Sequence, residues 1–323
     1  MAGGPTTPAL ATAVAEAGAF PFLAGGYKAP DALGAEVAQL RGSGRPFGVN
    51  LFVPGDQAVD AAAFAAYAAR LEPEAAAHGV TLDPHPVRDD DAWEAKLALL
   101  LAEPVPVVSL TFGLPSLHDV AALQHRGTRV LATVTTPDEA RASQAVGVDG
   151  VIAQGTDAGG HSGTHDPART PVAISTEALL RSVLAAVDLP VIAAGGVDGP
   201  AAVRSLLAAG AEAVAVGTML LRTDEAGTSP THRSALGDPS FTETVVTRAF
   251  TGRPARALRN GFVDRHDAAA PSEYPAVHHL TRQLRSAAGM AGDTDRLHLW
   301  AGTGYSSAPT GPAAHVVRWL TAE

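Results

Sequence analysis

The 323-residue sequence contains no cysteine, and this absence removes several kinds of chemistry at once. Disulfide bonds, thiolate metal sites and cysteine nucleophiles are excluded, although the lack of cysteine does not by itself identify a cellular compartment. Basic residues are also scarce, with 23 Lys and Arg against 33 Asp and Glu and a formal net charge of -10. Such an acidic surface repels phosphates, which argues against a sequence-independent nucleic-acid binder.

Long apolar runs are missing as well. The chain does not open with a charged segment followed by an apolar one, and no apolar stretch approaches the roughly 20 residues of a membrane-spanning helix. We therefore expect a cytoplasmic protein without a membrane segment. The hydrophobic content of 46% is sufficient for a large core, so the sequence predicts a globular protein.

Short aliphatic runs alternate with helical patterns over the first 220 residues, as is typical of parallel strands buried on both faces. The predicted strands are 21–24, 47–52, 105–112, 129–134, 150–154, 190–194 and 213–217. The predicted helices are 8–18, 31–41, 58–78, 116–126, 137–146, 175–187 and 200–209. Repeated βα units of this kind predict an α/β fold, either an eight-stranded (β/α) barrel, the TIM barrel, or an open doubly wound sheet. No Gly-x-Gly-x-x-Gly follows an early strand, which favours the barrel.

The pattern loosens after about Leu220 into Pro- and Gly-rich sequence with short helical pieces. We predict a barrel over residues 1–221 and a lid over residues 222–298 that covers the mouth of the barrel. Residues 299–323 are expected to return to the barrel.

The loop after the predicted strand at 150–154 is the most informative segment. Gly159, Gly160 and Gly163 surround His161, so the backbone can approach a bulky ligand while one imidazole faces it. This arrangement is typical of an active-site loop.

Two later strand ends also carry glycine. One has Gly195 and Gly196, and the other has Gly217 followed by Thr218. Each is followed by a helical segment, so backbone N–H groups and helix N-termini can point at one phosphate. The alternative is that these glycines simply form tight βα turns.

Four segments give the chain a resemblance to a known family, the FMN-dependent nitronate monooxygenases, formerly called 2-nitropropane dioxygenases. They are Gly48–Phe52, Gln154–Gly163, Ala193–Val197 and Ala215–Thr218, and their order and spacing run through nearly the whole chain. The resemblance implies an eight-stranded barrel with FMN at its C-terminal mouth.

The resemblance also implies roles for individual residues. Asn50 and Gln154 would hydrogen-bond the flavin ring system, and His161 falls on the catalytic histidine of the family. The loop glycines Gly159 and Gly160 would let the backbone pass close to the cofactor. The phosphate would be cradled by Gly195, Gly196, Ala215, Val216, Gly217 and Thr218.

The implied reaction is the oxidation of alkyl nitronates, and of nitroalkanes after deprotonation, by O2 to a carbonyl compound and nitrite. A neutral imidazole near its unperturbed pKa of ~6.5 can remove the acidic α-proton of a nitroalkane. FMN carries the redox step, and the protein supplies position and electrostatics.

Three further residues have open roles. Asp157 either orients His161 or caps the loop. His165 lies four residues after His161, but the glycines and Pro167 argue against a helix there, so no metal site is predicted. Tyr305 either borders the substrate or packs in the C-terminal segment.

Two other classes of function share these motifs. One is a reductase that uses NADH or NADPH with FMN, of the enoyl-ACP reductase or quinone reductase type. For that class an acyl carrier protein would be a partner. The basic residues of the late segment either recognise such a carrier or form ordinary ion pairs: Arg248, Arg253, Arg256, Arg259 and Arg265. The other is a barrel that binds FMN without turnover.

The start of the chain departs from the family pattern. Members have a first strand that ends in a stretch like Ala-Pro-Met-Ala-Gly-Gly, and Met1 to Gly4 begins inside that stretch. We expect the first strand to be missing, so that seven strands leave exposed edges where eight would close a barrel.

Overall fold

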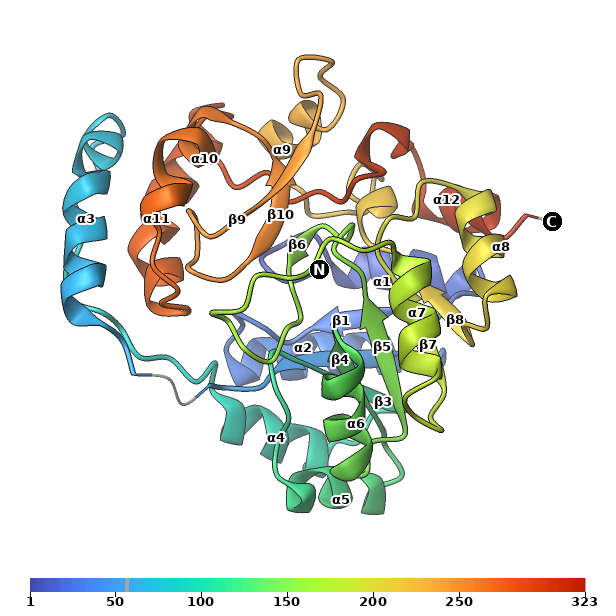
Figure 1. Ribbon diagram of the computed structural model, residues 1–323. Coiled ribbons are helices and arrows are strands. Elements are labelled where there is room, and N and C mark those ends of the chain that lie inside the picture. Colours follow the sequence, from blue (N-terminus) through green and yellow to red (C-terminus); the bar gives the residue numbers. More distant parts are fainter. Residues whose placement is uncertain (56–57, 323) are drawn as a thin grey trace.

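The computed structural model describes residues 1–55 and 58–322 and is built around seven parallel strands (Figure 1). The strand order is β1-β2-β3-β4-β5-β7-β8, so each strand of this sheet pairs with the one that follows it in the chain, apart from β6, which belongs to a second sheet. All seven predicted strands are confirmed: β1 (Phe22–Ala24), β2 (Gly48–Phe52), β3 (Val107–Thr111), β4 (Arg129–Val134), β5 (Gly150–Gln154), β7 (Val191–Ala194) and β8 (Ala213–Ala215).

The sheet curls as a barrel does but does not close within the described residues. β1 and β8 form its two edges. An eighth strand that paired with both edges would close the barrel, and the described residues contain no such strand. The expectation of seven strands in place of eight is therefore confirmed, and the inner face of the sheet is open along this gap.

Helices cover the outer face of the sheet, and most agree with the predictions to within three residues. They are α1 (Pro8–Glu16), α2 (Pro30–Arg41), α4 (Trp93–Ala102), α5 (Leu117–His125), α6 (Pro137–Ala145), α7 (Thr176–Leu184) and α8 (Pro200–Ala208). Ser116, Thr136 and Ser175 cap α5, α6 and α7, so the starts of these helices are readable from the sequence. The three side chains hold the helix N-termini next to the strand ends.

Helix α4 was not predicted. Its sequence is nearly apolar throughout, its N-terminus has no side-chain cap, and Ala92 before it has a positive φ of 53°. Lys96 is fully buried and forms an ion pair of 2.7 Å with Asp91, so a charged residue occupies a core position. Without an apolar stripe or a cap, periodicity gives no signal for this helix.

The lid consists of a small sheet and several helices. Strands β6 (Gly160–His161), β9 (Thr244–Thr247) and β10 (Ala255–Leu258) form an antiparallel sheet in the order β6-β10-β9. The helices are α9 (Pro230–Ala235), α10 (Gly261–His266) and α11 (Ala276–Met290), followed in the C-terminal segment by α12 (Ala313–Leu320). Three short 3-10 helices lie at Thr218–Leu220, Asp267–Ala269 and Tyr305–Ser307.

Helix α3 (Ala61–Ala76) belongs in space with the lid, although it follows β2 in the chain (Figure 1). It packs against α11, and Phe64, Tyr67 and Leu71 share an apolar cluster with Phe250 and Phe262 of the lid. The predicted division at residue 221 therefore separates residues that share one core.

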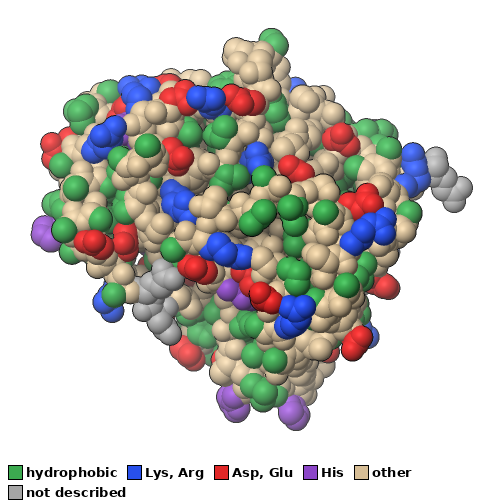
Figure 2. Space-filling model, in the orientation of Figure 1, with side chains coloured by type: hydrophobic (Ala, Val, Ile, Leu, Met, Phe, Trp, Pro, Cys, Tyr) green, Lys and Arg blue, Asp and Glu red, His purple; other side chains and the backbone are tan. Residues whose placement is uncertain are grey.

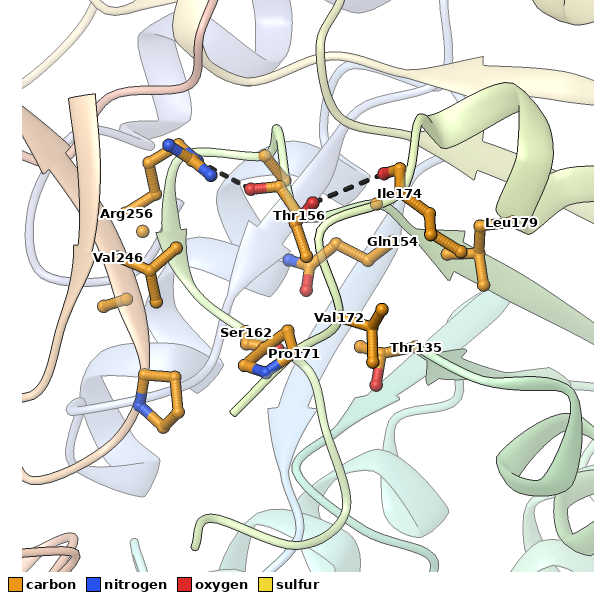
Figure 3. Close-up of a pocket in the computed structure, with 15 residues that line it drawn as sticks. Thr135, Gln154, Thr156, Ser162, Pro171, Val172, Ile174, Leu179, Val246 and Arg256 are labelled. Carbon is orange, nitrogen blue, oxygen red and sulfur yellow. Dashed lines mark hydrogen bonds between the residues drawn. The ribbon is translucent and has the colours of Figure 1, made fainter. Parts of the chain in front are cut away.

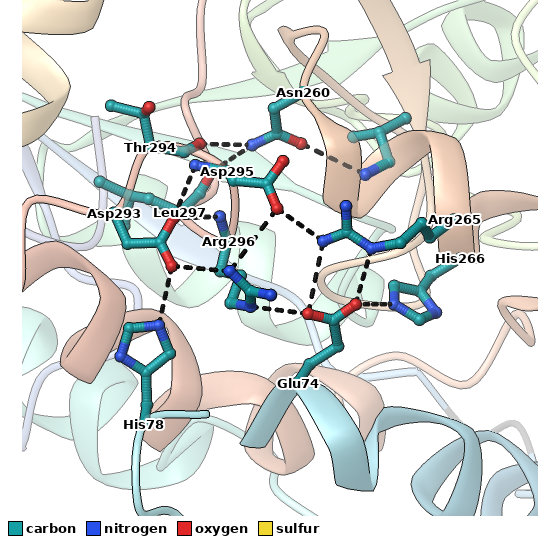
Figure 4. A network of polar contacts seen from close by, with 11 residues as sticks. Glu74, His78, Asn260, Arg265, His266, Asp293, Thr294, Asp295, Arg296 and Leu297 are labelled. Atoms are coloured by element: carbon teal, nitrogen blue, oxygen red, sulfur yellow. Dashed lines mark hydrogen bonds and ion pairs between the residues drawn. The ribbon is translucent and has the colours of Figure 1, made fainter. Parts of the chain in front are cut away.

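A charged network fixes the far end of α3 to the lid (Figure 4). The buried carboxylate of Glu74 accepts hydrogen bonds from Arg265 (2.7 Å) and Arg296 (2.6 Å) and lies 2.8 Å from Nε2 of His266. Burial alone would raise its pKa, but these hydrogen bonds and charges lower the pKa of Glu74 to about 2.

No helix among the described residues is long and apolar enough to cross a membrane.

Replacing Glu74 with Gln should destabilise the protein by about 2 kcal/mol at neutral pH, because the cationic partners lose their shared counter-charge. The depressed pKa means that the contribution is fully present above about pH 4.5 and is lost as the pH falls toward 2. Urea denaturation at pH 7 and pH 3 measures this, with the exposed Glu72→Gln on the same helix as control. Equal stability of Glu74→Gln and wild type at pH 7 would contradict the network's role.

Candidate active site

A large cavity lies inside the curled sheet at the carboxyl ends of the strands. Its volume is about 1780 Å³, above the roughly 300–1000 Å³ of ordinary ligand pockets. It extends along the inner face of the sheet, which is lined there by Val107, Leu131, Ile152 and Ile192. The cavity therefore has room for more than one small molecule.

Nearly all of the predicted site residues line this cavity. They are Asn50, Gln154, Gly159, Gly160, His161, Gly195, Gly196, Ala215, Val216, Gly217 and Thr218. Tyr305 is absent from the lining: it packs in an apolar cluster with Leu299 and Ala301, and its hydroxyl donates to the carbonyl of Phe241 (2.6 Å). The structure thus gives Tyr305 a packing role.

His161 lies in an aromatic wall at the junction of barrel and lid. Its ring centroid is 5.3 Å from that of Trp300, 5.6 Å from Tyr274 and 5.8 Å from Phe112. Its Nε2 lies 2.9 Å from Oγ1 of Thr251.

The electrostatic surroundings of His161 differ from the sequence expectation. Burial, reinforced by the positive charges of Arg253 and Arg285, lowers its pKa to about 3. The expected imidazole near its ordinary pKa is therefore wrong for this site. The ring is neutral throughout the physiological range, but it is a weak base.

Two buried arginines beside the site have no carboxylate partner among the described residues. Arg253 is 3% exposed and Arg285 is 5% exposed, yet neither takes part in an ion pair. Arg253 donates to the carbonyl of Thr164 (2.7 Å) and lies 4.0 Å from the ring centroid of Phe112. Arg285 donates to Thr281 and to the carbonyl of His278, and burial lowers the pKa of both guanidinium groups to about 10. The site therefore carries positive charge that the protein does not neutralise.

Gln154 holds the glycine-rich loop. Its Nε2 donates to the carbonyl of His161 (3.2 Å) and its Oε1 accepts from the backbone N–H of Gly163 (2.6 Å). The side chain predicted to contact the flavin is thus engaged with the loop on both of its amide atoms. Asn50 donates from Nδ2 to Ser109 and Thr111 (both 2.9 Å), and its Oδ1 makes no hydrogen bond with a described residue.

Figure 3 shows a small pocket behind the same loop, between β5 and the lid sheet. Arg256 donates from Nε to the carbonyl of Thr156 (2.6 Å), and the hydroxyl of Thr156 points toward the carbonyl of Ile174 (3.4 Å). The free volume of about 20 Å³ suits one water molecule. These contacts fix the back of the loop without providing a second ligand site.

The loop is also anchored beyond His161. The carboxylate of Glu139 accepts from the backbone N–H of His165 (2.9 Å), from Thr135 and from Arg169. The Nε2 of His165 lies 3.0 Å from the carbonyl of Thr133, so this ring has a structural contact. The described residues contain no group of three or more metal-ligating side chains.

Asp157 does not orient His161 in this structure. No hydrogen bond joins the two among the described residues; the Asp157 carbonyl accepts from the backbone N–H of Thr303 (3.1 Å). Its carboxylate lies against Gly196, where an added Cβ would be 3.4 Å from Oδ2. The backbone of Asp157 therefore links the glycine-rich loop to the C-terminal segment.

The glycine turns after β7 and β8 leave backbone donors free. Gly195 and Gly196 have positive φ angles of 108° and 70°. The N–H groups of Gly196, Gly217 and Thr218 make no hydrogen bond with any described residue, and all three residues line the cavity. Thr218 Oγ1 accepts from the N–H of Gly302 (3.0 Å), so its side chain joins the C-terminal segment. The turns form an N–H-rich recess suited to a phosphate.

Several lining residues were not predicted. Tyr27 and Phe112 have positive φ angles of 64° and 82°, strained values that cluster at functional sites. Phe112 directly follows β3 and Tyr27 lies three residues after β1, so their positions near strand ends could have identified them. The Tyr27 hydroxyl lies 3.0 Å from that of Tyr274, and the ring of His278 stacks on Tyr27 at 4.2 Å. Tyr274 and His278 come from the lid, where no sequence signal pointed to the site.

Comparisons with known proteins identify the family of the chain. A family model described as nitronate monooxygenase matches residues 1–323. A relative named nitronate monooxygenase, from Pseudomonas aeruginosa, is 39% identical over 332 residues, which cover 99% of this chain and 93% of the relative. The crystal structure of a nitroalkane oxidase from Streptomyces ansochromogenes matches with a TM-score of 0.95 and 50% identity, over 100% of this chain and 93% of that one. FabK from Thermotoga maritima matches with a TM-score of 0.75 and 26% identity, over 99% and 89% of the two chains.

Gly159 is where the loop approaches the C-terminal segment most closely. A Cβ atom there would lie 2.4 Å from the backbone N of Gly302 and 2.6 Å from the carbonyl carbon of Ala301. We expect Gly159→Ala to destabilise the protein by about 1–3 kcal/mol, because neither backbone can yield to relieve the contact. Thermal unfolding tests this against Gly113→Ala, whose Cβ would meet Val53 at an ordinary 3.6 Å. Equal melting temperatures of the two variants would show that the loop can relax.

Proposed function

The chain belongs to the nitronate monooxygenase family, and from this we propose that it is an FMN-dependent oxidoreductase that converts alkyl nitronates and O2 to carbonyl compounds and nitrite. The observation that carries the proposal is the charge of the site. A neutral His161 lies beside the buried, uncompensated guanidinium groups of Arg253 and Arg285. Buried charge without a partner is costly, so such a site favours an anionic substrate over a neutral one.

The lining residues fit FMN. The free N–H groups of Gly196, Gly217 and Thr218 would hold its phosphate, and the unengaged Oδ1 of Asn50 would accept a hydrogen bond from the flavin ring. Gln154 holds the loop through His161 and Gly163, and the second N–H of its Nε2 would donate to the flavin ring. When bound, FMN supplies the redox chemistry with the nitronate and O2.

His161 has a different task for each substrate form. A neutral nitroalkane must first lose its α-proton, and we propose that His161 in the cavity wall accepts it. The proton then sits on a ring whose charged form is disfavoured by burial and by two guanidinium groups. A preformed nitronate avoids this step, so we propose that nitronates are the better substrates.

A reductase that uses NADH or NADPH is the second candidate, favoured by the match to FabK over nearly the whole chain. The basic lid residues give it little support. Arg253 is buried, and Arg248 and Arg256 donate to the backbone carbonyls of Ala168 and Thr156. Arg259 pairs with Glu243 and Asp264, and Arg265 pairs with Glu74. Figure 2 shows positive and negative side chains interspersed on the visible face. An acyl carrier protein would find no continuous basic patch on that face.

The FMN-loaded protein should react with ethyl nitronate under anaerobic conditions roughly a hundredfold faster than with nitroethane, because nitroethane requires proton transfer to a weak base. Stopped-flow absorbance of the flavin measures both rates, with NADH and NADPH in parallel. Rapid reduction of the flavin by a nicotinamide, with no response to ethyl nitronate, would assign the protein to the reductases.

The pH dependence of nitroethane oxidation tests His161 separately. Only the neutral ring accepts a proton, and its lowered pKa of about 3 keeps it neutral above that pH, so kcat/KM for nitroethane should not fall between pH 8 and pH 5. His161→Asn should reduce this rate roughly 10²- to 10⁴-fold and the ethyl nitronate rate far less. A wild-type profile that drops with an apparent pKa near 6.5 would contradict the effect of burial.

A further inference from the structure

Thr251 is the one described residue that hydrogen-bonds the ring of His161. Its Oγ1 lies 2.9 Å from Nε2, whereas Nδ1 makes no hydrogen bond with a described residue and the ring lines the cavity. A neutral imidazole carries its single proton on either nitrogen, and the partner of one nitrogen decides what the other offers. The contact with Thr251 therefore bears on which atom of His161 meets the substrate.

The turn that carries Thr251 is held from several sides. The hydroxyl of Tyr67 on α3 donates to the carbonyl of Ala249 (2.6 Å), and the hydroxyl of Thr281 on α11 donates to the carbonyl of Phe250. Gly252 has a φ of +78°, and a Cβ there would lie 2.9 Å from the backbone of Glu273. Thr251 is 1% exposed. Its hydroxyl is therefore fixed relative to His161.

The Thr251 hydroxyl either donates to Nε2 of His161 or accepts from it, and its contacts with the backbone of Arg253 bear on which of the two it does. The Thr251 hydroxyl reaches the carbonyl of Arg253 at 3.4 Å, and a carbonyl can only accept. The hydroxyl also accepts from the backbone N–H of Arg253 at 3.4 Å. When its proton is donated to the Arg253 carbonyl, its remaining lone pair can accept a hydrogen bond from Nε2–H of His161. Nδ1, which makes no hydrogen bond with a described residue, is then the unprotonated ring atom.

We propose that Thr251 is a positioning residue that holds His161 in the Nε2–H form, so that Nδ1 is the atom that exchanges a proton with the substrate. This inference rests on the proposed oxidation of nitroalkanes and nitronates. It is independent of how FMN binds.

The proton step balances without a further reactant. The C–H bond at the α-carbon of a nitroalkane breaks, its electron pair stays on the nitronate, and the proton binds Nδ1. Nε2–H donates to Thr251 before and after the transfer, so no hydrogen bond has to reverse. Because the ring becomes cationic, the bond to Thr251 strengthens and partly offsets the repulsion from Arg253 and Arg285.

Thr251→Val keeps the branched shape of the side chain and removes the hydroxyl, whereas Thr251→Ser keeps the hydroxyl. We expect Thr251→Val to slow flavin reduction by nitroethane roughly ten- to a hundredfold, the value of a hydrogen bond to a charged group. Reduction by ethyl nitronate should fall much less, and Thr251→Ser should restore the nitroethane rate. Equal losses with both compounds would show a merely structural role and overturn the proposal.

A double-mutant cycle tests whether Thr251 acts through His161. In a His161→Asn background, Thr251→Val should cause no further loss with nitroethane, because the interaction has already been removed. Full additivity of the two losses would contradict the proposal. If wild-type protein reacts with neither compound, the proposed function fails, and the following measurement still decides the role of Thr251.

Nitrogen NMR of histidine-labelled protein reports the protonated atom directly and needs no turnover. The His161 signals are those missing from the His161→Asn variant. We expect Nε2 to carry the proton in wild type and in Thr251→Ser, and this preference to be lost in Thr251→Val. A proton on Nδ1 in wild type, or an unchanged Nε2–H form in Thr251→Val, would refute the proposal.

Discussion

The antiparallel pairing of β6 with β10 is the contact on which the site depends. It joins the loop after barrel strand β5 to the lid, with His161 opposite Ala255 and Gly160 opposite Arg256. The same pairing places the turn at Thr251 against the imidazole and the Arg253 guanidinium against Phe112. Without it, His161 would lie on an exposed glycine-rich loop, where burial could not control its protonation.

Charge is distributed differently on the two sides of the lid. Around Glu74, the side chains of Arg265, His266 and Arg296 have a carboxylate partner. Around His161, two buried arginines have none among the described residues. The protein pairs its charges around Glu74 but leaves the arginines near His161 without a carboxylate among the described residues, at the place where we expect an anion to bind. The burial that keeps His161 neutral therefore acts together with the arginines to favour a nitronate.

The lid has a core of its own that draws on distant parts of the chain. Helix α3, inserted after β2, packs against α11, and its Tyr67 hydroxyl binds the backbone next to Thr251. A helix that appears in sequence to be one of the barrel helices thus supports the turn that contacts His161. Boundaries drawn along the sequence cannot show this, because they follow chain order and not packing.

The seven barrel strands, most helices and the turns at the strand ends were predictable from the sequence. Parallel strands buried on both faces produce continuous apolar runs, and glycine at a strand end marks a turn whose conformation other residues rarely adopt. The loop at His161 and the glycine turns after β7 and β8 were identifiable for this reason. The sequence could not predict the lowered pKa of His161, the hydrogen bonds of Gln154 to its own loop, the packing of Tyr305 or the contact of Thr251 with His161. Each of these depends on groups that are far apart in the chain and brought together by the lid, and burial and charge are properties of that assembled environment.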